Sequence, residues 1–188
     1  MKRLVIAAAI LTSALLLGTG DPPAKEVGPL FELSGSYSNV KKPSIGVIGD
    51  EARWQQVWKD HKGDKLEVDA TDRPVVPYVD FSRCMVVAMF SGTTINGSGW
   101  HVISTQDLAD HTLIRYDRMG FQSESSGGDA SKFNTTDYGF AVLPRSSLPM
   151  VLEENIQTMI DAGPVWKERQ RLPALPKPTN TPGPKAFR

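Results

Sequence analysis

Apolar and polar residues alternate along much of this chain, and the most apolar stretch is the unbroken run at residues 84–90. Polar residues bound this run, and it is too short to cross a membrane. It therefore predicts a central strand, at 81–91, that is buried on both faces. The turn signal Asn96–Gly97 precedes the next apolar run, and we expect that run to be the hairpin partner of the central strand. Shorter or alternating runs predict the other strands, at 30–33, 44–48, 100–105, 112–118 and 138–144.

A clear helical spacing occurs at residues 50–61, where Asp50 is a suitable N-cap and Gly63 ends the helix. Residues 148–160 predict a second short helix. We therefore expect an α+β fold, in which an antiparallel sheet of about five strands packs against one N-terminal amphipathic helix, with a second short helix at the C-terminal side. The residues predicted to form the buried face of the first helix are Trp54, Val57, Trp58 and His61.

The first twenty residues have the three-part pattern of a secretory signal peptide: a basic start, an apolar core and small residues before Asp21. We expect a signal peptide at 1–20, a linker at 21–29, a single globular domain at 30–162 and a Pro-rich, disordered tail at 163–188. The chain is then a bacterial protein, secreted or periplasmic, without a membrane anchor after cleavage. A lipid anchor is not expected, because the only cysteine, Cys84, lies far from the cut site.

The chain carries 21 basic and 21 acidic residues, and loss of Lys2 and Arg3 with the signal peptide leaves 19 against 21. This balance argues against a nucleic-acid surface, which needs a basic face. One cysteine cannot form an internal disulfide, so the core alone must hold the domain together. Cys84 lies in the central apolar run and is expected to be a small buried side chain.

Residues suited to catalysis are few. The three histidines, His61, His101 and His111, lack the spacing of a zinc site, and no cofactor or metal is predicted. Ser98 lies in a glycine-rich turn, but the turn does not have the Gly-x-Ser-x-Gly pattern of a nucleophile elbow. A serine-type hydrolase that uses Ser98 with His101 or His111 and Asp110 stays open as an alternative.

The glycine turn is the better candidate for binding, because loops on a rigid scaffold commonly form contact surfaces. The predicted binding residues are Asn96, Gly97, Ser98, Gly99 and Trp100, together with the loop at 120–137. Trp100 is the anchor of this surface if its side chain points outward. If it points inward, it is a core residue of an alternating strand.

The order of these elements resembles the C-terminal domain of PrcB, the accessory protein of a surface protease complex in oral spirochaetes. The resemblance spans residues 44–145 and is carried by the tryptophan-bearing helix, by the run 79–90 and by the strand 138–144 that ends in Pro144. This chain departs from the family at Asn96–Trp100, where Ser98 separates the paired glycines and Trp100 replaces a tyrosine.

The resemblance implies an exported, non-catalytic binding or accessory module rather than an enzyme. Its partner is then an unidentified protein, and a protease is one candidate. The alternatives are the exported hydrolase described above and a structural protein of the cell envelope.

Overall fold

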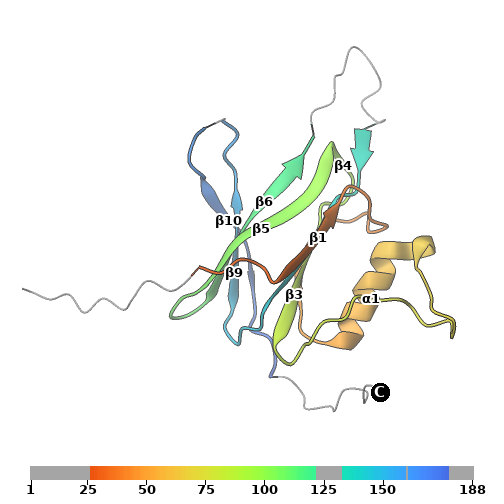
Figure 1. Cartoon of the computed structure of the whole chain (residues 1–188). Coiled ribbons are helices and arrows are strands. Elements are labelled where there is room, and N and C mark those ends of the chain that lie inside the picture. Colours follow the sequence, from red (N-terminus) through yellow and green to blue (C-terminus); the bar gives the residue numbers. More distant parts are fainter. Residues whose placement is uncertain (1–25, 122–132, 160, 178–188) are drawn as a thin grey trace, which may run out of the picture.

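The predicted central strand is strand β3 (Cys84–Phe90) of the computed structural model, which describes residues 26–121, 133–159 and 161–177. Met85, Val87 and Met89 belong to one buried cluster, whereas Val86, Ala88 and Phe90 belong to another on the opposite face. Burial on both faces is thus confirmed. β3 lies inside an antiparallel first sheet (Figure 1), with the order β1 (Phe31–Gly35), β8 (Tyr138–Pro144), β3, β2 (Ser44–Ile48).

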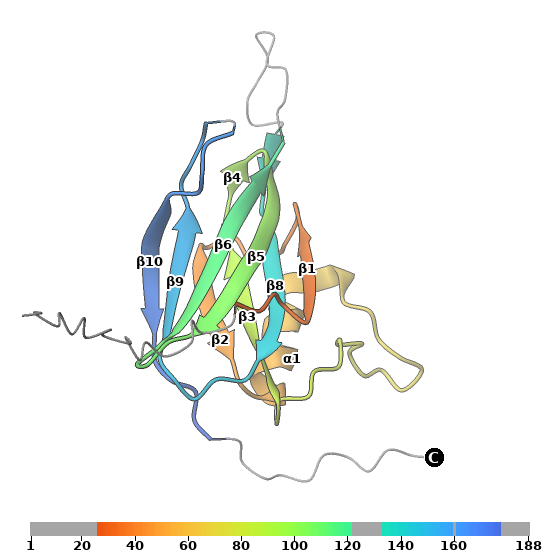
Figure 2. The same cartoon turned by 60° about the vertical axis from the view of Figure 1, so that its left-hand side comes forward.

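A second four-stranded sheet packs against the first, as Figure 2 shows. Its strands β6 (Thr112–Gly120) and β9 (Met150–Asn155) pair in parallel, and the other neighbours in this sheet pair antiparallel. A short pair of strands, β4 (Thr94–Ile95) and β7 (Asn134–Thr135), lies near one end of the two sheets. The second sheet has the order β10 (Trp166–Leu172), β9 (Met150–Asn155), β6 (Thr112–Gly120), β5 (Gly97–Asp107).

Helix α1 (Glu51–Lys62) covers the outer face of the first sheet. The carboxylate of Asp50 accepts a hydrogen bond from the amide of Arg53, and the amide of Gly63 caps the last turn by donating to Lys59 O. A short 3₁₀ turn, η1 (Gly63–Lys65), follows. The predicted helix is therefore confirmed, including its caps and the burial of Trp54, Val57, Trp58 and His61.

The predicted fold class is wrong, because strands dominate the structure and form two four-stranded sheets rather than one sheet of about five. β3 pairs with β2 and β8, whereas the expected hairpin partner, β5, lies in the other sheet and pairs with β6. The chain leaves the first sheet soon after β3, and Gly92 lies at this point with a positive φ of 70°, a conformation that glycine adopts without strain.

The second predicted helix is also wrong. Met150 and Leu152 face the core between the sheets, and the segment forms β9 because β6 and β10 satisfy its backbone on both sides. Residues 166–172, expected to belong to a disordered tail, form β10, so the ordered fold extends past the predicted boundary at residue 162. The expected signal peptide at 1–20 and the end of the tail, 178–188, lie outside the described residues. Among the described residues, no helix has the length and apolarity to cross a membrane.

Candidate functional site

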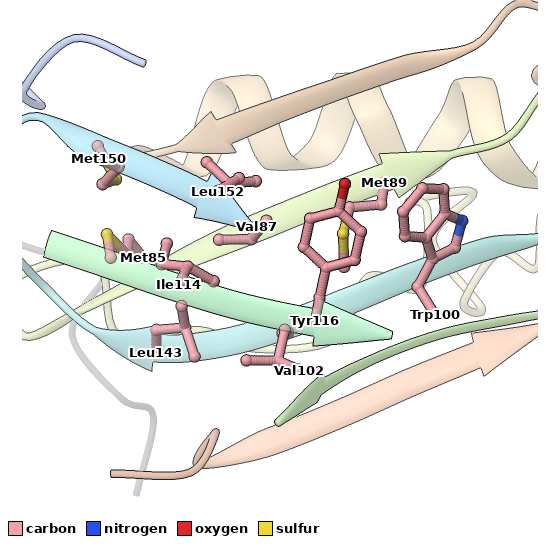
Figure 3. Packing of buried hydrophobic residues seen from close by; sticks show 11 residues of the cluster. Met85, Val87, Met89, Trp100, Val102, Ile114, Tyr116, Leu143, Met150 and Leu152 are labelled. Atoms are coloured by element: carbon pink, nitrogen blue, oxygen red, sulfur yellow. The ribbon is translucent and has the colours of Figure 1, made fainter. Parts of the chain in front are cut away.

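The predicted binding segment, Asn96–Trp100, begins at a turn and runs into the buried start of β5. Trp100 is only 6% exposed, and its ring packs against Tyr116 with the centroids 5.0 Å apart (Figure 3). Its indole nitrogen donates a hydrogen bond to Ser91 Oγ at 2.9 Å. Trp100 is therefore a core residue, and its side chain is not available as the anchor of a contact surface.

The backbone of Asn96–Trp100 packs against the buried carboxylate of Asp137 at Gly97. Asp137 accepts hydrogen bonds from Ser91 Oγ at 2.5 Å and from Thr94 Oγ1 at 2.6 Å, and it has no exposed surface. Gly97 and Gly99 are buried as well, and a methyl group at Gly97 would overlap the Asp137 carboxylate. Asn96 and Ser98 are only half-buried. The glycines are thus required by packing, and the segment offers a partner little side-chain surface.

The residues of the serine-type alternative lie apart. Ser98 is near the start of β5, whereas Asp110 and His111 follow its end, about 30 Å away at the rise of an extended strand. His101 bonds Glu32 of β1, with 2.5 Å between Nδ1 and Oε2. The described part of the chain also holds no group of three or more histidine, cysteine or acidic residues that could bind a metal.

An apolar concave site lies elsewhere, between α1, the segment 77–80 and the outer face of the first sheet. We call it the apolar cleft; its volume is about 340 Å³. Sequence reasoning missed it, although it predicted burial of the helix tryptophans. Its walls include Phe31 and Leu33 of β1, Trp54 and Trp58 of α1, Tyr78 of the 77–80 segment and Val142 of β8.

The two helix tryptophans build one wall of the apolar cleft. Trp54 Nε1 donates to Pro77 O at 2.8 Å, and Trp58 Nε1 donates to Val75 O at 3.0 Å. These bonds hold the returning loop alongside the helix. Arg145 links the chain just before α1 to the residue after the segment 77–80, because its Nη1 donates to Gly49 O and to Phe81 O.

Aromatic side chains stand exposed at the mouth of the apolar cleft. Phe31 is 57% exposed and Tyr78 is 90% exposed. Asp80 also lines the cleft, and its carboxylate accepts hydrogen bonds from the amide and hydroxyl of Ser82, which lower its pKa and keep it ionised. Cys84 reaches the same cleft and is only partly buried. The cleft therefore suits an apolar group, because the described structure places few polar groups around it.

His61, near the end of α1, is the most strongly perturbed base among the described residues. It is 5% exposed, and burial lowers its pKa to about 4, with a smaller contribution from the positive charge of Lys62. Its Nδ1 lies 3.0 Å from Ser38 Oγ, and its ring packs on Tyr138. The helical spacing predicts burial of His61 but gives no indication of its partner, Ser38, 23 residues earlier.

His61 makes the stability of the fold depend on pH. Its folded pKa lies below the ordinary value of 6.5, so the unfolded chain binds the extra proton as the pH falls. We expect the difference in unfolding free energy between wild type and His61→Gln to shift by about 2 kcal/mol between about pH 7.5 and about pH 5. Urea denaturation at both pH values measures this shift. Parallel pH dependences for the two proteins would refute the assignment.

Searches of protein-family models, curated proteins and solved structures find no significant match to this chain.

Proposed function

We propose that this chain is an exported, non-catalytic binding module that holds an apolar side chain of a protein partner in the apolar cleft. The observation that carries the proposal is the cleft itself, about 340 Å³ in volume and bordered by the exposed rings of Phe31 and Tyr78. Exposed apolar surface around a concave site is typical of contact surfaces. Aromatic residues that become buried on binding commonly contribute most of the affinity.

Two sequence features support the cellular setting of this proposal. The signal-peptide pattern at 1–20 favours a secreted or periplasmic protein. The resemblance to the PrcB C-terminal domain favours an accessory role beside a protease. The site proposed here is not the glycine turn at Asn96–Trp100 but the cleft near the other end of the first sheet, because Trp100 is buried and Tyr78 is not.

Tyr78 offers a direct test, because the chain contains another highly exposed apolar side chain away from the apolar cleft. Met159 is 70% exposed and does not line the cleft. We expect the wild-type chain and Met159→Glu to recover the same stoichiometric protein from cells of the source organism. Tyr78→Glu should lose it, because a carboxylate at the mouth opposes burial of an apolar group.

Thermal melting of the purified chains supplies the control, since both substitutions are at exposed positions and should leave the melting temperature nearly unchanged. Recovery of the protein by Tyr78→Glu at the wild-type level would contradict the proposal. Equal loss from both variants would place the contact outside the cleft. A structural envelope protein would instead retain its stoichiometric neighbour when the cleft is altered.

A further inference from the structure

A second concave site, the lysine pocket, lies where α1 ends, between η1, the segment 37–41 and the start of β8. Its volume is about 310 Å³. Lys41 lines it from one part of the chain and Lys62 and Lys65 from another, and Asp64 is the one acidic residue among the described lining residues. The pocket therefore holds a local excess of two positive charges, although the 21 basic and 21 acidic residues of the whole chain balance.

Buried hydroxyl groups and a histidine form the floor of the lysine pocket. Ser38, His61 and Thr136 are all less than a tenth exposed. Thr136 Oγ1 donates to Ser38 O at 2.6 Å and accepts from Ser38 N at 2.9 Å. Ser38 Oγ accepts from Val40 N at 3.1 Å. This network is fully defined within the described residues and fixes the position of the serine hydroxyl beside the ring of His61.

The same network bears on the proton of His61. Ser38 Oγ accepts from Val40 N and lies 3.0 Å from the ring atom Nδ1, so its own hydrogen is free to donate to Nδ1. With Nδ1 as the acceptor and the ring neutral near pH 7, the ring proton is on Nε2. Within the described residues every buried side-chain nitrogen or oxygen has a partner, and none bonds Nε2; this N–H is therefore accessible, and the space beside it is the pocket.

The acceptors around the lysine pocket are already engaged. His61 O accepts from Asn39 N at 2.9 Å, and Ser38 O accepts from Thr136 Oγ1 and, at 3.3 Å, from Lys41 Nζ. Burial raises the pKa of Tyr138, so its hydroxyl stays protonated and can donate. Beside Asp64 and the side-chain amide of Asn39, the pocket presents donors: ammonium groups, the ring of His61 and a phenol.

We propose that the lysine pocket binds a divalent oxyanion of the phosphate or sulfate class. Its two negative charges match the local excess of two positive charges, and its oxygen atoms accept from the donors at the floor and rim. A free ion and a phosphate ester on a larger molecule share this chemistry. This site is separate from the apolar cleft and does not depend on the function proposed for the cleft.

The test is a titration of the full chain followed by the NMR signals of the His61 ring, with sodium sulfate, inorganic phosphate and glycerol phosphate as probes and sodium chloride at matched ionic strength as the control. We expect a saturable shift with the divalent anions and none with chloride. A bound anion also favours the charged imidazole, so the pKa of His61 should rise. Saturation by glycerol phosphate would identify an esterified phosphate as an acceptable ligand, and saturation by the inorganic ions alone would identify a free ion.

Neighbouring lysines supply matched variants. Lys41→Ala and Lys65→Ala should each weaken sulfate binding about 5- to 10-fold, because each removes one charged donor. Lys42 and Lys59 are close in sequence to the lining lysines but do not line the pocket. Lys42→Ala and Lys59→Ala should therefore leave the affinity for sulfate unchanged. Circular dichroism verifies that all four variants fold. No saturable shift with any divalent anion, an equal shift with chloride, or equal losses in the lining and control variants would overturn the proposal.

Discussion

Replacing Trp100 by alanine should lower the free energy of unfolding by about 3–5 kcal/mol, the usual cost of removing a large buried aromatic side chain. The ring fills space between the sheets beside Tyr116, and the Arg118 guanidinium lies 5.1 Å above it. Its loss also removes the hydrogen bond to Ser91 Oγ, one of the groups that surround the buried Asp137. Urea denaturation measures the effect.

Ile95 supplies the control for this substitution, because it lies in the same part of the chain and is 58% exposed. Ile95→Ala should change the unfolding free energy by less than about 0.5 kcal/mol. A Trp100→Ala protein that melts like wild type and fails to capture a partner would contradict the buried position and restore Trp100 as a contact residue.

Gly97→Ala should destabilise the fold by at least about 2 kcal/mol, because the added methyl group would overlap the Asp137 carboxylate and come within 2.9 Å of Thr94 Oγ1. Either the backbone shifts or the carboxylate leaves its hydroxyl donors, and a buried charged group without its partners is costly. The unfolding free energy measured in urea tests this expectation.

Gly46 is the matched control, since it is also a strand glycine but has no atom within 4 Å of the place that an added methyl group would occupy. Gly46→Ala should be neutral or slightly stabilising, because alanine restricts the unfolded chain. If both alanine variants lost the same free energy, the loss would come from strand glycines in general and not from the Asp137 contact.

Local signals in the sequence predicted the elements better than their pairing. The helix at 50–61 and the central strand follow from spacing, caps and composition within short windows; the helix is confirmed, and the strand predicted at 81–91 forms at 84–90. The partner of β3 is not a local property. β8 begins 48 residues after β3 ends, whereas the nearby β5 belongs to the other sheet.

The segment 148–160 shows how a short apolar run misleads. Its residues fit a helical face as well as the alternation of a strand, and only the neighbours β6 and β10 decide between them. The charged residues of β10 similarly predict a solvated tail when only the sequence is considered. In the structure they belong to an edge strand, where charged side chains protect against aggregation.

The candidate site was less predictable than the fold. The glycine turn attracted attention because Asn96–Gly97 and Trp100 are strong local signals, yet burial of Trp100 requires the second sheet. The apolar cleft joins Phe31, the helix tryptophans and Tyr78, which lie far apart in sequence. Considered singly in the sequence, each of these side chains is typical of an ordinary strand, core or loop residue. Their exposure depends on how the segment 77–80 returns along α1.

The central claim is that the apolar cleft accepts an apolar side chain, and Cys84 allows it to be measured directly. Cys84 is the only cysteine and lines the cleft, so iodoacetamide labelling followed by mass spectrometry reports on this site alone. We expect indole at millimolar concentration to slow the labelling several-fold, and Val142→Phe, which fills the cleft, to abolish this protection. An unchanged labelling rate in saturating indole, or equal protection in Val142→Phe, would contradict the account.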